Sequence, residues 1–584
     1  MSTPAERARS AIARGDFIAA YDIAVGAIAE GDASEDIRHQ QVLALARMGD
    51  TDRAMEVFRS HGLEGSADPH KRAAGARLLK DRALSLAPGE VRRAALETAS
   101  EAYHSVFLES GDSFPGINAA TLALLAGRRE AAHSLAETLL ADPLVAAGGD
   151  YFAGVTKAEA LLVLGRIDAA ADALQARSVG ASADHGGRAS SRRQLAMIAD
   201  HFGLSRDRRE ALLGPLSPPG VVYYAGHMFA SDPAVEAEVQ ARIEALLAVE
   251  KAGFGYGALA CGADILFAEA LLERGAELNV VLPFAEEDFI AQSVDPGGKG
   301  WLPRYRACLE AAASVTFASA IPYFGDPAQY GYGSRMAMGL ARLRAGHLDC
   351  SAVQLVVWDG VESTGPAGTG ADVAAWRSSG GRSVAVAPGA VDRRLTRPEA
   401  AHESRYERVL AAILFTDFVG FSKLPEHVLP VFWDGIMRCI AEILDSHEGE
   451  VECRNSWGDA LYAVTSSAPA AAEIALELQA RLAGFDYSTL GLDGSGGMRV
   501  GGHYGPAYRT IDHITGRTTF YGTEVSRAAR IEPVTPPGAV FVTEPLAAIL
   551  ALEARERFAC RYVGRISLAK NYGEYPMYRL QRAG

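Results

Sequence analysis

RVLAAILFTDFVGFSKL, residues 408–424, gives the clearest indication of local structure in this chain of 584 residues. The apolar run VLAAILFT predicts a buried β-strand, and Asp417 follows at its end. Further along, EGEVECRNSWGDALYAVTS predicts two strands joined by a hairpin at Gly458-Asp459. A helix expected over residues 430–446 connects these regions, so Asp417 and Asp459 are expected to meet on neighbouring strand ends.

These two aspartates indicate chemistry as well as structure. Two facing carboxylates with no basic residue nearby in sequence are typical of a site for divalent metal ions. Asp417 and Asp459 are therefore candidate metal ligands, and the alternative is that both are surface turn residues.

Three motifs follow one another in the C-terminal part: FTDFVGFS, NSWGDALYAV and YGTEVSRAARI. Their order and spacing resemble the catalytic domain of class III adenylate and guanylate cyclases, over residues 407–584. The resemblance implies a ferredoxin-like α+β fold and a head-to-tail homodimer in which each active site is built from both chains. It also implies cyclisation of a nucleoside triphosphate, with loss of pyrophosphate, at two Mg²⁺ or Mn²⁺ ions per active site held by Asp417 and Asp459.

The same resemblance implies roles for further residues. Arg530 matches the arginine that neutralises charge on the α-phosphate in the transition state. Ser526 stands where the family usually has an asparagine that orients the ribose, and its spacing places it on the same helical face as Arg530. The amides of the loop after Asp417 are expected to bind the β- and γ-phosphates. The expected substrate-binding residues are Phe418, Val419, Gly420, Phe421, Ser422, Asn455, Thr519 and Lys570.

Two positions bear on the choice of base. Thr519 occurs in one branch of adenylate cyclases, whereas Asn455 stands where these enzymes have a lysine. ATP is therefore the favoured substrate, with GTP and the pyrimidine triphosphates left open. Because Asn455 and Ser526 both depart from the family pattern, a catalytically silent nucleotide-binding scaffold is the alternative. The two retained aspartates favour the enzyme.

Strands and helices alternate over residues 217–390. PPGVVYYAGHMF, LNVVLPF, VTFASA and VQLVVWDG predict buried strands, and a helix is expected over residues 233–252. This alternation predicts a doubly wound, Rossmann-like parallel sheet. Such sheets bind ligands at the carboxyl ends of their strands.

Two glycine-rich loops fit that position: residues 257–264, GALACGAD, and residues 365–372, GPAGTGAD. The pair resembles the SLOG superfamily, which includes phosphoribohydrolases and ligand sensors. Because Asp372 replaces the glutamate of that family, sensing of a nucleotide-like ligand is favoured, and an N-glycosidase or plain tight turns are the alternatives. Thr369 is expected to cap the following helix or to contact a phosphate. The candidate ligand-binding residues are Gly257, Gly262, Asp264, Gly368, Thr369 and Asp372.

Residues 1–205 carry apolar residues at helical spacing. Gly15-Asp16 and Gly49-Asp50 are 34 residues apart, the period of a tetratricopeptide helix pair, and each glycine is expected to end a helix in a left-handed cap. The segment SFPGINAATLALLAG resembles the TRAF-binding region of mitogen-activated kinase kinase kinases. The repeats are expected to be a structural spacer or a surface for a protein partner or oligomerisation.

Composition narrows the remaining possibilities. With 57 basic and 72 acidic residues, the net charge of −15 argues against general binding to nucleic acid or acidic membranes. The six cysteines form no CxxC pair, so neither a disulfide framework nor a zinc ribbon is indicated. We see no signal peptide or long apolar run and expect a cytoplasmic protein without a membrane span. Residues 391–406 are polar and aperiodic and are expected to form a linker.

Overall fold

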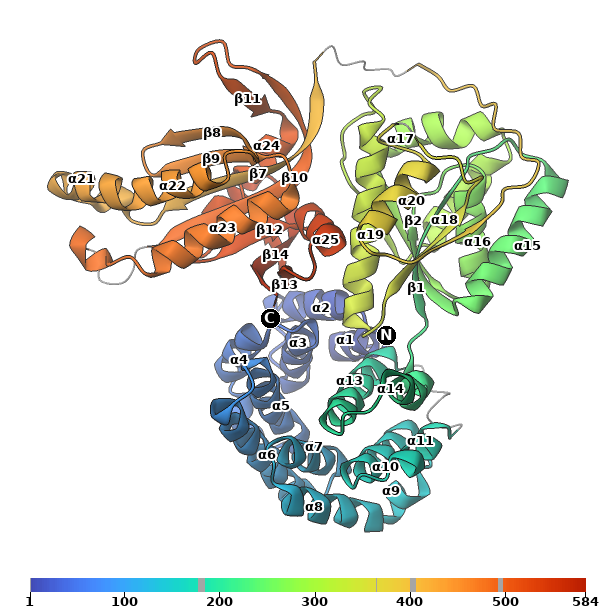
Figure 1. The fold of residues 1–584 in the computed structure, drawn as a ribbon, viewed down its shortest axis with the longest axis vertical. Coiled ribbons are helices and arrows are strands. Elements are labelled where there is room, and N and C mark those ends of the chain that lie inside the picture. Colours follow the sequence, from blue (N-terminus) through green and yellow to red (C-terminus); the bar gives the residue numbers. More distant parts are fainter. Residues whose placement is uncertain (1, 177–183, 364, 400–405, 492–496, 584) are drawn as a thin grey trace. The chain divides into compact units, whose positions relative to one another are not determined.

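The computed structural model describes residues 2–176, 184–363, 365–399, 406–491 and 497–583 (Figure 1). The chain divides into two compact units, Met1–Pro218 with Gly346–Cys350, and Pro219–Ala345 with Ser351–Ala583. The predicted fold class is confirmed: the first unit is helical, and the second contains a parallel α/β sheet and a mixed sheet. Among the described residues, we find no helix with the length and apolar character needed to cross a membrane.

Antiparallel helix pairs form the first unit, and glycine–aspartate steps separate several of them. Gly15 and Gly49 have φ values of 75° and 81°, so both adopt the left-handed conformation predicted for the helix ends. Asp16 and Asp50 follow them and cap the next helices by accepting hydrogen bonds from main-chain amides. The helices are α1 Pro4–Ala13, α2 Phe17–Ala29, α3 Glu35–Met48, α4 Thr51–Ser60, α5 Pro69–Ser85, α6 Glu90–Ser110, α7 Ser113–Leu125, α8 Arg129–Ala141, α9 Pro143–Ala147, α10 Tyr151–Val163, α11 Ile167–Leu174, α13 His185–His201 and α14 Arg206–Leu213.

Helix α7 contains the segment that resembles a TRAF-binding region. Its residues Pro115–Leu124 are buried almost without interruption. Asn118 on this helix accepts a hydrogen bond from Lys80 of α5, at 2.8 Å, and another from Gln194 of α13, at 3.1 Å. The segment therefore joins helices that are distant in sequence, which is a structural role.

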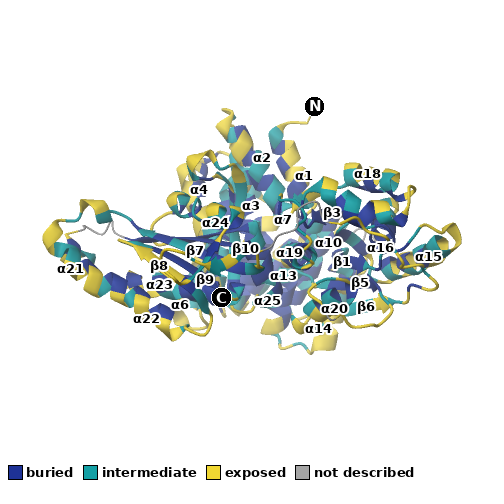
Figure 2. Ribbon diagram, turned by 90° about the horizontal axis from the view of Figure 1, so that it is seen from above, coloured by how far each residue is buried: buried dark blue, intermediate teal, exposed yellow. Residues whose placement is uncertain are grey.

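A six-stranded parallel sheet forms the α/β part of the second unit. Its strand order is β4-β3-β2-β1-β5-β6, and every neighbouring pair is parallel, as predicted. In Figure 2 the central strands of this sheet are mostly dark blue, because helices cover both faces, whereas the edge strands β4 and β6 are partly exposed. The strands are β1 Gly220–Gly226, β2 Ala252–Gly257, β3 Glu277–Leu282, β4 Ser314–Phe317, β5 Ala352–Val357 and β6 Ser383–Val386. The helices are α15 Pro233–Val249, α16 Ala263–Glu273, α17 Glu286–Phe289, α18 Trp301–Ala311, α19 Ala328–His347 and α20 Thr369–Ser378.

Strand β2 corrects the sequence-based expectation, which extended helix α15 to residue 252 and treated the glycines after it as a turn. The helix ends at Val249, and β2 begins at Ala252. A Cβ atom on Gly255 would lie 2.3 Å from Leu271 of α16, and one on Gly257 would lie 2.5 Å from the Tyr224 ring. These glycines therefore allow helix α16 and the Tyr224 ring of β1 to approach strand β2 closely.

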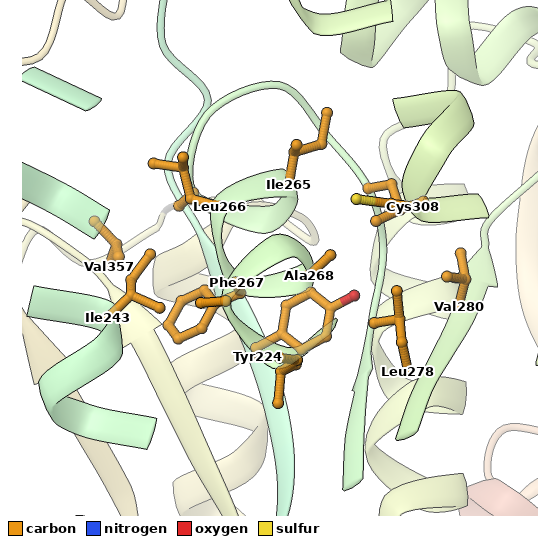
Figure 3. Close-up of a cluster of buried hydrophobic side chains, with 14 of the residues drawn as sticks. Tyr224, Ile243, Ile265, Leu266, Phe267, Ala268, Leu278, Val280, Cys308 and Val357 are labelled. Atoms are coloured by element: carbon orange, nitrogen blue, oxygen red, sulfur yellow. The ribbon is translucent and has the colours of Figure 1, made fainter. Parts of the chain in front are cut away.

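The core around β1 and α16 is shown in Figure 3. The rings of Tyr224 and Phe267 stack with centroids 5.6 Å apart, and both side chains are fully buried. Cys261 and Cys308 also belong to this cluster, and burial raises the pKa of both thiols to about 12. Both cysteines therefore act as small packing residues.

The C-terminal part of the second unit is built on an eight-stranded mixed sheet. Its order is β13-β14-β12-β10-β7-β9-β8, and β11 pairs with β10. The strands are β7 Arg408–Phe418, β8 Val451–Trp457, β9 Ala460–Thr465, β10 Met498–Ile511, β11 Thr518–Tyr521, β12 Val540–Thr543, β13 Phe558–Ser567 and β14 Glu574–Arg582. The α-helices are α21 Leu429–Phe432, α22 Arg438–Ser446, α23 Ala468–Ala483, α24 Thr523–Ala528 and α25 Glu544–Glu553. A π-helical turn, Trp433–Met437, connects α21 to α22.

Candidate active site and ligand pocket

The two candidate metal ligands lie together at one end of the mixed sheet. Asp417 is the last but one residue of β7, and Asp459 lies in the turn between β8 and β9. The amide of Phe418 donates a hydrogen bond to Asp459 Oδ2 at 3.3 Å, which ties the hairpin to the end of β7. Burial raises the pKa of Asp459, and the neighbouring negative charge of Asp417 raises it further.

Arg499 and Glu532 belong to this cluster but were missed from the sequence. Arg499 lies opposite Asp417 in the register of β10 and β7, and its guanidinium forms ion pairs with Asp417 and, at 2.8 Å, with Glu532. Burial raises the pKa of Glu532 to about 7, with Arg499 opposing the rise. No local pattern in the sequence marks either residue, because only the register of β10 against β7 brings Arg499 to Asp417.

The donor set of this cluster fits divalent ions of the Mg²⁺ or Mn²⁺ type. The negative charges of two adjacent carboxylates repel each other, so nearby positive charge stabilises them. In this structure Arg499 supplies part of that positive charge. Over the described parts of the chain, no group of three or more His, Cys, Asp or Glu side chains is suited to hold a metal. Asp417 and Asp459 would therefore hold such ions as a pair, with remaining positions left for water and substrate.

The loop after Asp417 was predicted to offer five amides to the phosphates. Two of them are already engaged, because Phe418 donates to Asp459 and Val419 donates to the carbonyl of Gly497 at 3.0 Å. Gly420 has φ 92° and precedes a short 3₁₀ turn, Phe421–Lys423. The prediction therefore applies to the three amides from Gly420 onward, because the side chain of Asp459 and the carbonyl of Gly497 accept hydrogen bonds from the first two.

The sequence predicted that Arg530 and Ser526 share one face of a helix, but in the structure they do not. Helix α24 ends at Ala528, so Arg530 lies in the turn beyond it, while Ser526 is exposed on the helix. The carbonyl of Arg530 accepts a hydrogen bond from Ala569 at 3.3 Å, which places the following Lys570 turn beside Arg530. Two basic residues predicted to contact phosphates therefore lie on adjoining turns.

The Lys570 turn has an unusual backbone. Lys570 and Asn571 have φ values of 61° and 55°, both in the left-handed region that disfavours side chains with a Cβ atom. The lysine side chain is exposed.

The two residues predicted to read the base lie on β8 and β11, which contact each other. Asn455 is exposed, and its Oδ1 accepts a hydrogen bond from the amide of Ser456 at 2.9 Å. Thr519 is half-buried on β11. The hydroxyl of Tyr462 donates to the carbonyl of Phe520 at 3.0 Å, which fixes β11 against β9.

A cavity of about 870 Å³ lies at the carboxyl ends of the strands of the parallel sheet. Gly226 ends β1 and His227 follows it, Ala258 follows β2, and Asp359 follows β5, and all four line the cavity. Successive strands are added on one side of β1 as far as β4 and on its other side from β5 onward. The point between β1 and β5 where the strand order changes side is where such folds bind ligands.

Four of the six predicted ligand residues line this cavity: Asp264, Gly368, Thr369 and Asp372. Gly257 and Gly262 are not among the lining residues, and packing accounts for both glycines. Gly257 is the last residue of β2, against the Tyr224 ring, and a Cβ on Gly262 would lie 2.7 Å from Phe229.

Thr369 does not cap helix α20 with its side chain. Its hydroxyl lies 3.5 Å from Nδ1 of His227, and Nε2 of His227 lies 3.1 Å from Asp359. The second glycine loop is therefore connected to the histidine that follows β1.

Asp264 and Asp372 are both only 8% exposed. Asp372 Oδ2 accepts hydrogen bonds from Tyr223 at 3.0 Å and Ser334 at 3.2 Å, while Asp264 Oδ2 accepts one from the amide of Ala260 at 3.3 Å. Burial raises the pKa of each carboxyl group to about 7, despite these hydrogen bonds.

Part of the segment predicted to be a linker belongs to the pocket. Arg393, Leu395 and Arg397 line the cavity, and the carbonyl of Asp392 accepts a hydrogen bond from Ala230 at 3.0 Å. Val391 and Leu395 pack against the α/β core, which a polar and aperiodic sequence did not suggest. Residues 400–405, in the second half of the predicted linker, lie outside the described residues.

Comparison with solved structures found several cyclases. The adenylyl cyclase CyaB from P. aeruginosa is 16% identical, covers 31% of this chain and 98% of its own, and gives a TM-score of 0.28. The guanylate cyclase domain of RhGC from Catenaria anguillulae, in complex with GTP, is 17% identical, with coverages of 30% and 100% and a TM-score of 0.27. An adenylate cyclase from Trypanosoma brucei, in its monomeric state, is 22% identical, with coverages of 29% and 87% and a TM-score of 0.27.

Two regions match family models. Residues 16–123 match the Tetratricopeptide Repeats-Sensor family, and residues 402–582 match the Adenylate and Guanylate cyclase catalytic domain. No curated protein matches the chain. Neither family match covers the central α/β region, whose resemblance to the SLOG superfamily stays a prediction. These matches bear out the resemblance to tetratricopeptide repeats near the start of the chain and to the adenylate and guanylate cyclase catalytic domain over residues 402–582.

Proposed function

We propose that this protein is a nucleotidyl cyclase that converts a nucleoside triphosphate, with ATP favoured, into its 3′,5′-cyclic nucleotide and pyrophosphate. The observation that carries the proposal is the pairing of Asp417 with Asp459, with Arg499 as counter-charge, inside a region matched by the cyclase family. A scaffold that only binds nucleotide would gain nothing from two carboxylates held against each other.

In this reaction the 3′-hydroxyl attacks the α-phosphorus of the same nucleotide, and pyrophosphate leaves. When bound, two Mg²⁺ or Mn²⁺ ions supply charge neutralisation at the triphosphate and make the 3′-hydroxyl more acidic. Asp417 and Asp459 hold these ions, and the amides from Gly420 onward hold the phosphates. Arg530 neutralises the charge that develops on the α-phosphate.

The remaining residues orient the substrate. Lys570, on the turn beside Arg530, contacts the triphosphate, and Ser526 orients the ribose, directly or through water. Asn455 and Thr519 hydrogen-bond the base, and each side chain carries both a donor and an acceptor. We propose that the active form is a homodimer, with the aspartates of each site supplied by one chain and Arg530 by the other.

The decisive experiment incubates the full-length protein with each labelled nucleoside triphosphate and Mg²⁺ or Mn²⁺. Products are resolved by chromatography. We expect a cyclic nucleotide, in largest amount from ATP, and no product from Asp459→Ala. Asp434→Asn, a change at an exposed aspartate of the same domain, is the matched control and should keep full activity. Nucleotide binding without any cyclic product would favour the scaffold.

We also propose a regulatory function for the α/β cavity, which would bind a nucleotide-like ligand and alter cyclase activity. Its size is in the range of small-molecule sites, and it lies at the ligand-binding edge of its fold. The helical repeats, whose first part matches a sensor-associated repeat family, would bind a protein partner. Activity of the full chain, measured with and without nucleotides other than the substrate, tests the cavity proposal.

A further inference from the structure

We infer that the floor of the α/β cavity, formed by Asp264 and Asp372, binds a hydrogen-bond donor group of an anionic ligand, while the anionic end of that ligand lies toward Arg393 and Arg397. The donor group is either a sugar hydroxyl pair or an amine. This inference rests on the proposed function of the cavity as a nucleotide-like ligand site, and it adds the orientation and the chemistry at each end.

The floor has hydrogen-bond acceptors that the protein leaves unmatched. Asp264 lines the cavity, and its Oδ1 has no hydrogen-bond partner, although the side chain is more than nine-tenths buried. Asp372 receives hydrogen bonds only from neutral hydroxyl groups, those of Tyr223 and Ser334. Among the residues that the structure describes, no cationic side chain forms an ion pair with either carboxylate. A buried acceptor without a partner is costly, and a ligand that donates hydrogen bonds removes this cost.

The same floor disfavours phosphate. When they are ionised, the two buried carboxylates repel an anion, and in a region of low dielectric the repulsion is larger than in water. The glycine loop Gly368–Gly370 lies beside Asp372, so a phosphate held there would lie close to this carboxylate. Ribose hydroxyls or an amine suit the position better, because each donates to carboxylate oxygens.

Cationic and aromatic groups also line this cavity. Arg393 and Arg397 are exposed and come from the segment after β6. Arg393 is paired with Asp359, whereas the guanidinium of Arg397 lies 3.1 Å from the sulfur of Met228. Arg397 is therefore the arginine more readily available to a phosphate.

Aromatic rings supply a surface for a base. The rings of Tyr323 and Tyr330 lie with centroids 5.4 Å apart, next to Phe284, and both tyrosines line the cavity. A planar base can stack on such rings. A nucleoside monophosphate therefore matches the cavity in three respects: sugar donors toward the aspartates, base against the tyrosines, and phosphate toward Arg397.

The test is calorimetric titration of the full-length protein in EDTA, which suppresses metal-dependent binding at the cyclase site. The probes are AMP, 2′,3′-dideoxy-AMP, 2′-amino-2′-deoxy-AMP and inorganic phosphate. We expect AMP or its amino analogue to bind at least about 10-fold more tightly than dideoxy-AMP, and phosphate alone to bind most weakly. Tighter binding of AMP identifies hydroxyl groups as the donors, and tighter binding of the amino analogue identifies an amine.

The isosteric variant Asp264→Asn sharpens the test. Because the amide of Ala260 donates to Oδ2, the asparagine oxygen should remain there and its NH₂ group should replace the unpaired Oδ1. A donor then faces the donor of the ligand, so binding of the preferred probe should fall by at least about 10-fold. Asp372→Asn is a second variant with the same expectation. Asp295→Asn, exposed and outside the cavity lining, is the matched control.

Two results would overturn the inference, and they differ in what they say about the cavity. If AMP and dideoxy-AMP bind equally well, and Asp264→Asn and Asp372→Asn bind AMP like the unaltered protein, the orientation is wrong while the cavity remains a nucleotide site. If none of the probes binds, both the orientation and the proposed cavity function fail. Unfolding temperatures of the variants, measured in parallel, show whether a loss of binding reflects a loss of folding.

Discussion

Two pairs of aspartates in the second unit have the same composition but different surroundings. Asp417 and Asp459 lie at the end of the mixed sheet, where the side chain of Asp417 is 30% exposed and paired with Arg499. Asp264 and Asp372 line the α/β cavity, are 8% exposed and receive only neutral hydrogen-bond donors. The first pair is accessible and has a cation beside it, whereas the second is buried and has none.

The difference shows how environment decides what two carboxylates do. At the accessible pair, Arg499 offsets part of the negative charge, and water and substrate can reach the carboxylate oxygens that divalent ions require. In the buried pair, desolvation raises the pKa of both groups to about 7. Near neutral pH the protonated and ionised forms of each group therefore have similar free energies. Such groups suit a ligand that donates hydrogen bonds or brings positive charge of its own.

The largest effect is expected from the accessible pair. Asp417→Ala and Asp459→Ala should each lower cyclase activity by a factor of about 1,000 or more, because losing a metal ligand removes several kcal/mol of transition-state stabilisation. Initial rates at saturating Mn²⁺ measure this effect, and circular dichroism checks the fold. Near-normal turnover in either variant would mean that this aspartate is not a metal ligand.

Much of the fold could be predicted because its signals are local. The Gly-Asp steps at residues 15 and 49 end one helix and cap the next, whatever surrounds them. Strand β2 was missed because glycines at alternate positions removed the apolar pattern of a strand. Those glycines are explained only by side chains distant in sequence, such as Leu271 against Gly255.

Some residues of the candidate sites could be predicted from the sequence, and others could not. Asp417 and Asp459 stand out because each adjoins a recognisable strand or hairpin. Arg499 is 82 residues from Asp417, and only the strand register brings the two together. Asp264 is buried in the structure, but no local sequence pattern distinguishes it from an exposed aspartate in the first turn of a helix.

The next effect concerns the division of the site between chains. Asp417→Ala keeps Arg530, and Arg530→Ala keeps both aspartates, so a mixed dimer has one intact site. Equal amounts of the two inactive variants, unfolded and refolded together, should recover roughly a quarter of the normal activity, since half of random dimers are mixed and each has one site of two. No recovery in dimers shown to be mixed would place the whole site within one chain.

A smaller effect is expected from the counter-charge of the accessible pair. Replacing Arg499 with methionine leaves Asp417 and Glu532 without their shared cation. The unfolding free energy should fall by about 2–3 kcal/mol, as expected when one partner of a partly buried ion pair is removed. Mn²⁺ should restore more stability to this variant than to the unaltered protein. An equal response of both proteins to Mn²⁺ would separate Arg499 from the metal site.

The smallest effect concerns the buried pair and depends on pH. The folded-state pKa of Asp264 is about 7, against an ordinary value of 3.8, so between these values the folded protein binds a proton that the unfolded chain does not. Stability contributed by this proton is complete below about pH 4 and is lost as pH rises through 7. Asp264→Asn removes the titration, so its stability relative to the unaltered protein should increase from pH 5 to pH 8, by on the order of 1–2 kcal/mol.

Urea unfolding followed by tryptophan fluorescence measures this change. Three of the five tryptophans, Trp301, Trp358 and Trp376, lie in the α/β part, so the signal weights the region that contains Asp264. Asp295→Asn, which removes an exposed carboxylate, should follow the unaltered protein at both pH values. If Asp264→Asn follows it as well, Asp264 ionises normally in the folded protein, and the contrast between the buried and the accessible pair fails. If the difference grows with pH as expected, burial without a neighbouring cation distinguishes Asp264 and Asp372 from the accessible pair.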